Sequence, residues 1–219
     1  MNDKIYKFGA ISFIFSGFLF LSYFILSNLV PVAPSDKLLL NDWIEEWKFF
    51  IQMMDELLIF ATVFLMPSIY VIARILNANH SPLALIASFI FMFLIVPIFI
   101  LIDLLVGRLV YPVFNYQMSN DIILFILSLS VGSMHCISLL LSISIFLFTL
   151  SFRNQYHDIF LIIIGVLTSI CQIVGAYPWL INSKLNLICQ LSFPIWLIYI
   201  GILLLIKKKI FLQTSKTTI

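Results

Sequence analysis

Asp55, Glu56, Asp103 and His135 are the ionisable residues that we expect closest to the membrane interior. Asp55 and Glu56 come just before the run that begins at Leu57, Asp103 lies near the end of another run, and His135 lies near the middle of a third. An ionisable side chain at membrane depth is costly unless it finds a partner or water, so such residues indicate functional sites. Carboxylates attract cations, and a histidine can relay a proton or bind a metal or haem. We therefore predict ligand binding at these four residues.

Two of these residues, Asp103 and His135, also have structural explanations. Asp103 has Arg108 five positions further on, and an ion pair that reaches the outer interface would account for both. A neutral buried His135 could donate to a carbonyl or a hydroxyl. Gln172 and Gln190 stand in two further apolar runs, where amides commonly form hydrogen bonds between helices.

The sequence lacks the common catalytic and metal-binding motifs. It has no H-E-x-x-H, G-x-S-x-G or C-x-x-C, no phosphate-binding glycine loop and no histidine pair at i, i+4. Cys136, Cys171 and Cys189 lie within apolar runs without metal-type spacing, so we interpret them as reduced packing residues. We predict no catalytic residue, metal or cofactor, although an intramembrane enzyme could use dispersed residues.

Six apolar runs must position these side chains. The chain is 63% hydrophobic and 10% charged, with a mean hydropathy of +1.15. The runs cover residues 8–29, 57–76, 82–105, 122–150, 159–177 and 185–206. About 20 apolar residues cross a bilayer as a helix, and a backbone in lipid must satisfy its own hydrogen bonds. We therefore predict one all-α membrane domain over residues 1–219, an up-and-down bundle of six transmembrane helices.

Basic residues indicate how this bundle is oriented. Lys and Arg on alternate sides of the runs number eight and four. The eight are Lys4, Lys7, Arg74, Arg153, Lys207, Lys208, Lys209 and Lys216, and the four are Lys37, Lys48, Arg108 and Lys184. The positive-inside rule then places both termini in the cytoplasm, for a multi-pass protein of the cell (inner) membrane. The net charge of +2 is scattered, which argues against nucleic-acid binding.

The connection over residues 30–56 is long and acidic. It carries six acidic residues and two lysines, a net charge of −4. Residues 43–56 have helical periodicity, and Asp42 and Glu45 have capping-box spacing, so we expect an external amphipathic helix that continues into the second run. Trp43 and Trp47 share its apolar face and are predicted interface anchors. This segment is either a lip that attracts cations or an interfacial helix.

Prolines and run lengths predict irregular helices. Pro67 and Pro97 each remove one backbone hydrogen bond within a run and predict kinks. The run 122–150 exceeds the hydrocarbon thickness, so it must tilt or protrude. Ser81 and Pro82 have the spacing of an N-cap and a first helical residue.

Several short stretches give the chain a family resemblance. They are Met54-Asp55-Glu56-Leu57 with Tyr70 to Leu76, His80-Ser81-Pro82-Leu83-Ala84-Leu85, Met134-His135-Cys136-Ile137-Ser138, Ile164-Gly165-Val166-Leu167 and Gly175-Ala176-Tyr177. With them, about two thirds of the chain resembles a family of small bacterial integral membrane proteins described only as a domain of unknown function. The resemblance implies a bundle of six or seven helices with no assigned activity.

The polar residues favour one function and leave two alternatives. We expect a non-enzymatic protein, in contact with membrane lipids, that binds or passes a small hydrophobic or cationic molecule within a cavity lined by the second, third and fourth helices. Asp55, Glu56, Asp103 and His135 would contact that ligand. One alternative is a lipid- or quinone-modifying enzyme that uses His135, and the other is a structural or immunity-type partner of another membrane protein. The sequence does not specify the oligomeric state.

Overall fold

The computed structural model describes residues 3–77, 81–111, 118–156 and 158–206, which form helices and no strand. The helices are α1 (Asp3–Leu29), α2 (Leu40–Asn77), α3 (Pro82–Ile90), α4 (Val96–Val110), α5 (Asn120–Tyr156), α6 (Ile159–Gly175) and α7 (Ser183–Ile206). Short 3₁₀ helices, η1 (Lys37–Leu39) and η3 (Pro178–Leu180), precede α2 and α7, and a π-helix, η2 (Phe91–Ile95), joins α3 to α4. The all-α bundle is as predicted.

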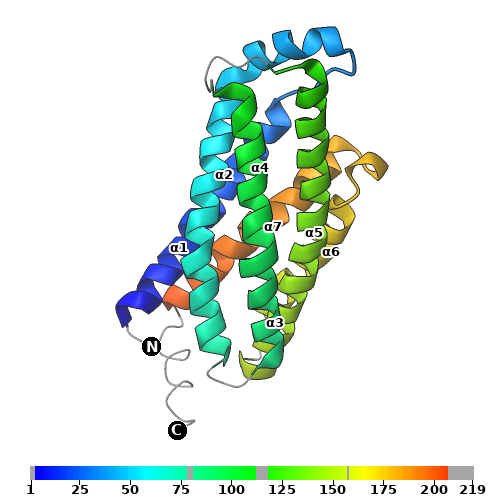
Figure 1. The fold of residues 1–219 in the computed structure, drawn as a ribbon. Helices are drawn as coiled ribbons and strands as arrows, with labels where there is room; N and C mark the ends of the chain where they lie inside the picture. The colour runs from blue at the N-terminus through cyan, green and yellow to red at the C-terminus, as the bar shows by residue number, and fades with distance from the viewer. Residues whose placement is uncertain (1–2, 78–80, 112–117, 157, 207–219) are drawn as a thin grey trace.

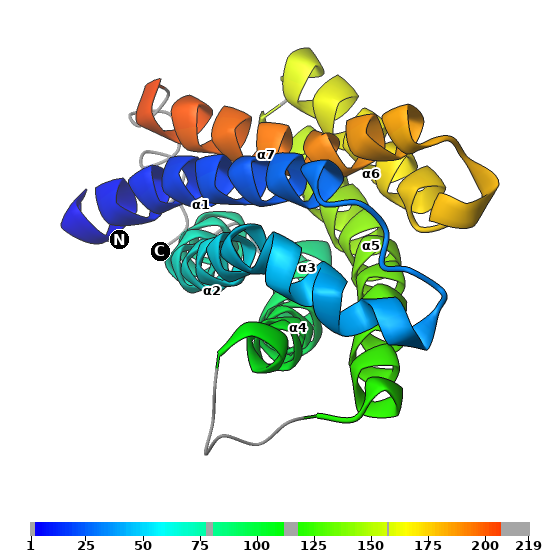
Figure 2. The same ribbon diagram turned by 90° about the horizontal axis from the view of Figure 1, so that it is seen from above.

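Successive helices run in opposite directions, except that α4 continues in the direction of α3 (Figure 1). In Figure 1, α1 starts at the lower end, α2 returns to it, and α7 also ends there. Seen from above, α1 lies between α2 and α7, its two main packing partners (Figure 2). The helix pairs α5 with α6, α6 with α7, and α4 with α2 also pack together. The predicted up-and-down order therefore describes this bundle.

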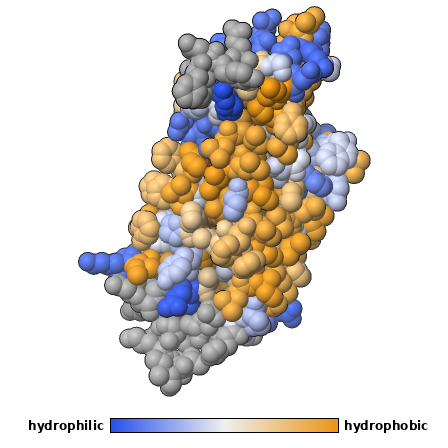
Figure 3. All heavy atoms as spheres, viewed as in Figure 1, coloured by the Kyte–Doolittle hydropathy of each residue, from blue (hydrophilic) through white to orange (hydrophobic). Residues whose placement is uncertain are grey.

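Within the part of the chain that the structure describes, five helical stretches are long and apolar enough to cross a membrane. They are α1, α2 with η1, the continuous stretch α3 to α4, α5 and α7. On the face shown in Figure 3, apolar residues cover the middle and polar residues gather toward the ends. Five of the six predicted spanning helices are confirmed, whereas α6 has only 17 residues, so a crossing by α6 stays a prediction. The apolar run continues to Tyr177, but the helix ends at Gly175 and the chain turns into η3 at Pro178.

The α2 helix runs without interruption from the acidic segment into the second apolar run, as predicted, and has 38 residues. It starts at Leu40, ahead of the expected cap at Asp42. The preceding turn η1 explains this earlier start, because the Asp36 side chain accepts from the backbone N–H of Leu38 and η1 leads directly into α2. The first turns of α2 lie across the upper end of the bundle in Figure 1.

This upper end has a hydrophobic core of its own, separate from the main one. Its buried residues come from three helices: Leu40, Ile44 and Ile51 of α2, Leu109 and Val110 of α4, and Ile123 and Ile126 of α5. We call the parts of these helices around this second core the head. Trp43 and Trp47 pack against it, and the Trp43 indole N–H donates to the Pro31 carbonyl at 3.2 Å. Both indoles thus help to close the head, and their role as interface anchors remains a prediction.

The third apolar run is interrupted next to its proline. Pro97 lies in the first turn of α4, directly after the π-helix η2. A proline has no N–H to donate to the residue four positions earlier, here Phe93, and irregular turns at such positions bend membrane helices. The predicted irregularity at Pro97 therefore takes the form of a π-helical turn.

The main core holds α1 tightly against α7. The Phe20 ring packs against Phe99 and Phe193, with centroids 4.9 and 5.2 Å apart. Gly201 of α7 faces α1 so closely that a Cβ there would lie 2.8 Å from the Ala10 carbonyl oxygen. Gly132 on α5, in contrast, has no atom within 4 Å of such a Cβ.

Replacing these two glycines by alanine should change stability in opposite directions. Gly201→Ala should lower the free energy of unfolding by about 1–3 kcal/mol, because backbone must move to admit the methyl group. Gly132→Ala should raise it by up to about 1 kcal/mol, since alanine favours a helix more than glycine does. The measurement is thermal unfolding of both variants in one detergent. Equal midpoints for the two variants would contradict the close α1–α7 contact.

Candidate functional site

Asp55 of α2 lies against the backbone of α4 where the head joins the main core. A Cβ at Gly107 would be only 2.8 Å from Asp55 Oδ2, so the glycine leaves room for this carboxylate. Asp103 lies one helical turn before Gly107 on α4, which places both on the same face. The two carboxylates, together with that of Glu56, are close enough to repel one another.

Neither aspartate has a cation paired with it among the described residues, and Asp55 is buried while Asp103 is half-buried. Asp55 is only 9% exposed, and Oδ1 of Asp55 and Oδ1 of Asp103 are both buried without a hydrogen-bond partner. None of the ion pairs among the described residues involves either aspartate. A buried carboxylate is destabilising unless it is protonated, paired or bound to a cation. Protonation or a bound cation would each lower this cost.

The expected ion pair between Asp103 and Arg108 was wrong. The Arg108 guanidinium donates through Nη1 to the Tyr111 carbonyl at 3.3 Å, and no ion pair joins it to Asp103 in the described part of the chain. Helix geometry gives the reason, because two residues five positions apart differ in direction by about 140° around the axis. An ion pair with Arg108 therefore does not explain the position of Asp103.

Two tyrosines complete the site. Tyr23 of α1 is 7% exposed and lies close enough to Asp55 and Asp103 to interact electrostatically with them. At the rim, the Tyr111 hydroxyl donates to Glu56 Oε1 at 2.9 Å. Burial, followed by the hydrogen bond to Glu56 and its negative charge, raises the pKa of Tyr111 to about 12. Tyr111 therefore stays protonated at neutral pH and remains a donor to Glu56.

The structure places His135 in different surroundings. Its Nδ1 lies 2.6 Å from the Ala176 carbonyl oxygen, and because a carbonyl only accepts, Nδ1 carries the proton. The ring packs against Tyr177 and Trp179, with centroids 5.2 and 5.5 Å apart. In Figure 1 the α6–α7 turn, which carries these partners, lies beside the middle of α5. His135 thus attaches this turn to α5.

The four predicted ligand-binding residues therefore fall into two places. Asp55, Glu56 and Asp103 come together, whereas no described interaction joins His135 to any of them. The described residues also contain no group of three or more His, Cys, Asp or Glu side chains that could hold a metal ion. The cysteines are free, but Cys136 is exposed, so its predicted packing role was wrong.

Sequence reasoning missed Tyr23, Gly107 and Tyr111 as parts of the site. A signal existed for Gly107, which follows Asp103 at i+4 and so shares its helix face. Tyr23 is a polar group in the middle of the first apolar run, where it was overlooked. Tyr111 lies 55 positions from Glu56, so only the fold reveals their hydrogen bond.

The fold and this site define a membrane-type α-helical bundle that has a buried Asp55 and a half-buried Asp103 near one end. Comparison with known proteins finds no matching family model, no matching curated protein and no matching solved structure. The resemblance to a bacterial membrane family of unknown function therefore remains a prediction.

Removing one of the buried charges should stabilise the ligand-free protein. Asp55→Asn eliminates the repulsion with Asp103 and should raise the free energy of unfolding by about 1 kcal/mol or more. Asp42→Asn, an exposed change in the same helix, is the control and should have almost no effect. Thermal unfolding in detergent without added cations measures both. A destabilised Asp55→Asn variant would mean that the carboxylate has a structural partner.

Substitutions of His135 should separate its hydrogen bond from its ring contacts. His135→Phe keeps a ring but loses the donor to Ala176, and should destabilise the protein by about 1 kcal/mol. His135→Ala also loses the ring contacts and should cost about 0.5–1.5 kcal/mol more. The readout is again the unfolding midpoint, and an unchanged midpoint in both variants would show that His135 does not hold the turn.

Proposed function

We propose that this protein binds a small cationic molecule between α1, α2 and α4, and passes it through the membrane. The observation that supports this most directly is the pair Asp55 and Asp103, each with a buried oxygen that lacks a hydrogen-bond partner. Proteins rarely keep such groups unless function requires them, because each lowers stability. A bound cation would supply the missing charge.

The surroundings of the pair favour an organic cation. Two carboxylates can accept hydrogen bonds from one planar or multivalent nitrogen group. Tyr23 adds an aromatic ring, which attracts organic cations through its face. Glu56 and Tyr111 form an exposed rim through which a cation could reach the aspartates. A small amine, amidine or guanidine matches this combination better than a bare metal ion, which would need more oxygen ligands.

We further propose that the protein lies in the bacterial cytoplasmic membrane with both termini inside. The support is the excess of Lys and Arg on the terminal side, of which Lys207, Lys208, Lys209 and Lys216 lie outside the described residues. The acidic pair would then lie at the external end. The negative charge of residues 30–56 would concentrate cations there.

The two alternative functions have less support. A lipid- or quinone-modifying enzyme would need a second reactive group near His135, whose described neighbours are a carbonyl and two aromatic rings. A structural or immunity-type partner would not require buried acidic groups without a partner. Both remain predictions.

Methylguanidinium and its neutral isostere methylurea can test the proposal. Isothermal titration calorimetry in a neutral detergent should detect methylguanidinium binding to the wild type and none for methylurea. Asp55→Asn/Asp103→Asn should weaken binding at least ten-fold, which corresponds to about 1.4 kcal/mol. Uptake of labelled methylguanidinium into proteoliposomes then tests passage.

The matched control removes the same charge from the head surface. Asp42→Asn/Glu46→Gln changes two exposed residues of α2 and should leave the affinity within about two-fold, since exposed charges are screened by salt. An equal loss in both double variants would show that only the general negative charge matters. Binding that survives in the Asp55/Asp103 variant, or no binding to the wild type, would contradict the proposal.

A further inference from the structure

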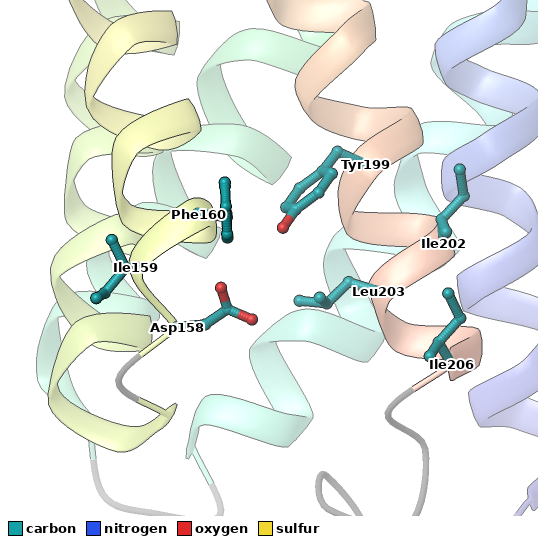
Figure 4. A pocket seen from close by; sticks show the side chains of 7 residues that line it. All are labelled: Asp158, Ile159, Phe160, Tyr199, Ile202, Leu203 and Ile206. Atoms are coloured by element: carbon teal, nitrogen blue, oxygen red, sulfur yellow. The ribbon is translucent and has the colours of Figure 1, made fainter.

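The helices α6 and α7 are separated at one end and in close contact at the other. A pocket of about 540 Å³ lies between the start of α6 and the last turns of α7, where Phe160 and Leu203 line it (Figure 4). Near the turn that joins the two helices, a Cβ at Gly175 would lie only 2.9 Å from the Cβ of Cys189. The glycine therefore allows the start of α7 to approach the α6 backbone at Cys189.

Hydrogen bonds beside this contact fix how α6 lies along α7. The Gln172 side-chain amide donates to the Cys189 carbonyl at 2.9 Å and to the Ser192 hydroxyl at 3.1 Å. The Thr168 hydroxyl donates to the Ser192 carbonyl at 3.5 Å. Residues three or four positions apart share a helix face, and Cys171 follows Thr168 at i+3. Cys171 therefore lies on the face of α6 that meets α7.

Two thiols meet at this contact, and they differ in access. The Cys171 and Cys189 thiols lie close enough to interact, and neither is part of a disulfide. Cys189 is 2% exposed, whereas Cys171 is half-buried, so a reagent from outside reaches Cys171 first. In redox-sensitive proteins, an accessible thiol often lies next to a second thiol that converts the oxidised first one to a disulfide. Cys171 and Cys189 have this arrangement.

The surface around the two cysteines indicates which oxidants can reach them. Ile170 and Ile173 of α6 and Ile188 of α7 are all exposed, and each lies one or two positions from one of the cysteines. An oxidant therefore approaches across an apolar surface, where a charged compound such as oxidised glutathione would lose its hydration. A hydroperoxide has an uncharged O–O group, and both hydrogen peroxide and a lipid hydroperoxide carry it.

We propose that Cys171 and Cys189 are a redox-sensitive pair that a hydroperoxide converts to a disulfide between α6 and α7. The Cys171 sulfur attacks the O–O bond and keeps one oxygen as a sulfenic acid, while the other oxygen leaves as water or an alcohol. The Cys189 sulfur then attacks the Cys171 sulfur, the S–O bond breaks, and the hydroxyl leaves as water with the Cys189 proton. Two thiols and one hydroperoxide thus give one disulfide, one water, and a second water or an alcohol.

The disulfide would tie together the two sides of the α6–α7 turn. The two cysteines flank this turn, in which the Ala176 carbonyl accepts from His135 and Trp179 packs against the His135 ring. A link that closes a loop restricts the unfolded chain, so oxidation should stabilise the folded protein. The inference does not depend on the proposed function, because it concerns other residues and needs no bound cation.

Mass spectrometry of the full chain in a neutral detergent can test this proposal. The reduced protein is treated with hydrogen peroxide or with the hydroperoxide of methyl linoleate, and the remaining thiols are blocked with N-ethylmaleimide before digestion. Both oxidants should join the peptides that contain Cys171 and Cys189, and dithiothreitol should restore both thiols. The unfolding midpoint should rise with the link and fall again on reduction. The faster of the two reactions identifies the aqueous phase or the membrane as the source of the oxidant.

Single substitutions separate the roles of the two thiols. Cys189→Ser should abolish the link and let the Cys171 sulfenic acid accumulate, so that dimedone traps it, because no second thiol reacts with it. Cys171→Ser should leave the buried Cys189 unmodified. Cys136→Ser is the matched control, since Cys136 is exposed on another helix, and it should leave the yield of the link unchanged.

Several results would overturn the inference. Oxidation of Cys171 to a sulfinic acid in the wild type, without a link to Cys189, would show that the thiols are not placed to pair. A pair left unmodified under conditions that oxidise Cys136 would show that Cys171 is out of reach. Formation of the link by oxidised glutathione as readily as by either hydroperoxide would contradict the apolar approach.

Discussion

The thickness of a bilayer is the constraint on which the rest of this structure depends. The hydrocarbon core measures about 30 Å, and helices of 38 and 37 residues extend over about 57 and 55 Å. Both α2 and α5 are therefore longer than a single crossing needs. Their excess length builds the head, where parts of α2, α4 and α5 enclose a second hydrophobic core. The acidic pair lies where these two cores meet.

This position explains why charged groups are tolerated there. Within the main core, side chains are mostly apolar or bonded to backbone carbonyls, as with Ser16 to Ala61 and Gln172 to Cys189. At the junction with the head, Glu56 is exposed while Asp55 is buried, so solvent exposure changes from one residue to the next. Gly107 permits this arrangement because any larger residue would occupy the space of the Asp55 carboxylate. A ligand could thus meet buried charge close to water.

Local features of the fold could be predicted well from the sequence. Ser81 caps α3 with Pro82 in its first turn, and Gln172 donates to the Cys189 carbonyl as the expected link between helices. These features depend on residues a few positions apart or on one rule of membrane packing. Predictions that required side-chain directions were less successful. Arg108 points to the Tyr111 carbonyl, and His135 finds its partners 41 or more positions away, in a turn whose height depends on the length of α6.

The sequence by itself determined that this chain forms membrane-type helices, because apolar length and backbone hydrogen bonding leave no other fold in lipid. It also indicated an up-and-down order, because several connections between the apolar runs are short enough to favour antiparallel neighbours. Only the tertiary structure decided which polar residues meet. Asp55 lies near Asp103, and His135 lies apart from both. These positions depend on the rotation and crossing of the helices, which are set by packing between residues far apart in the sequence.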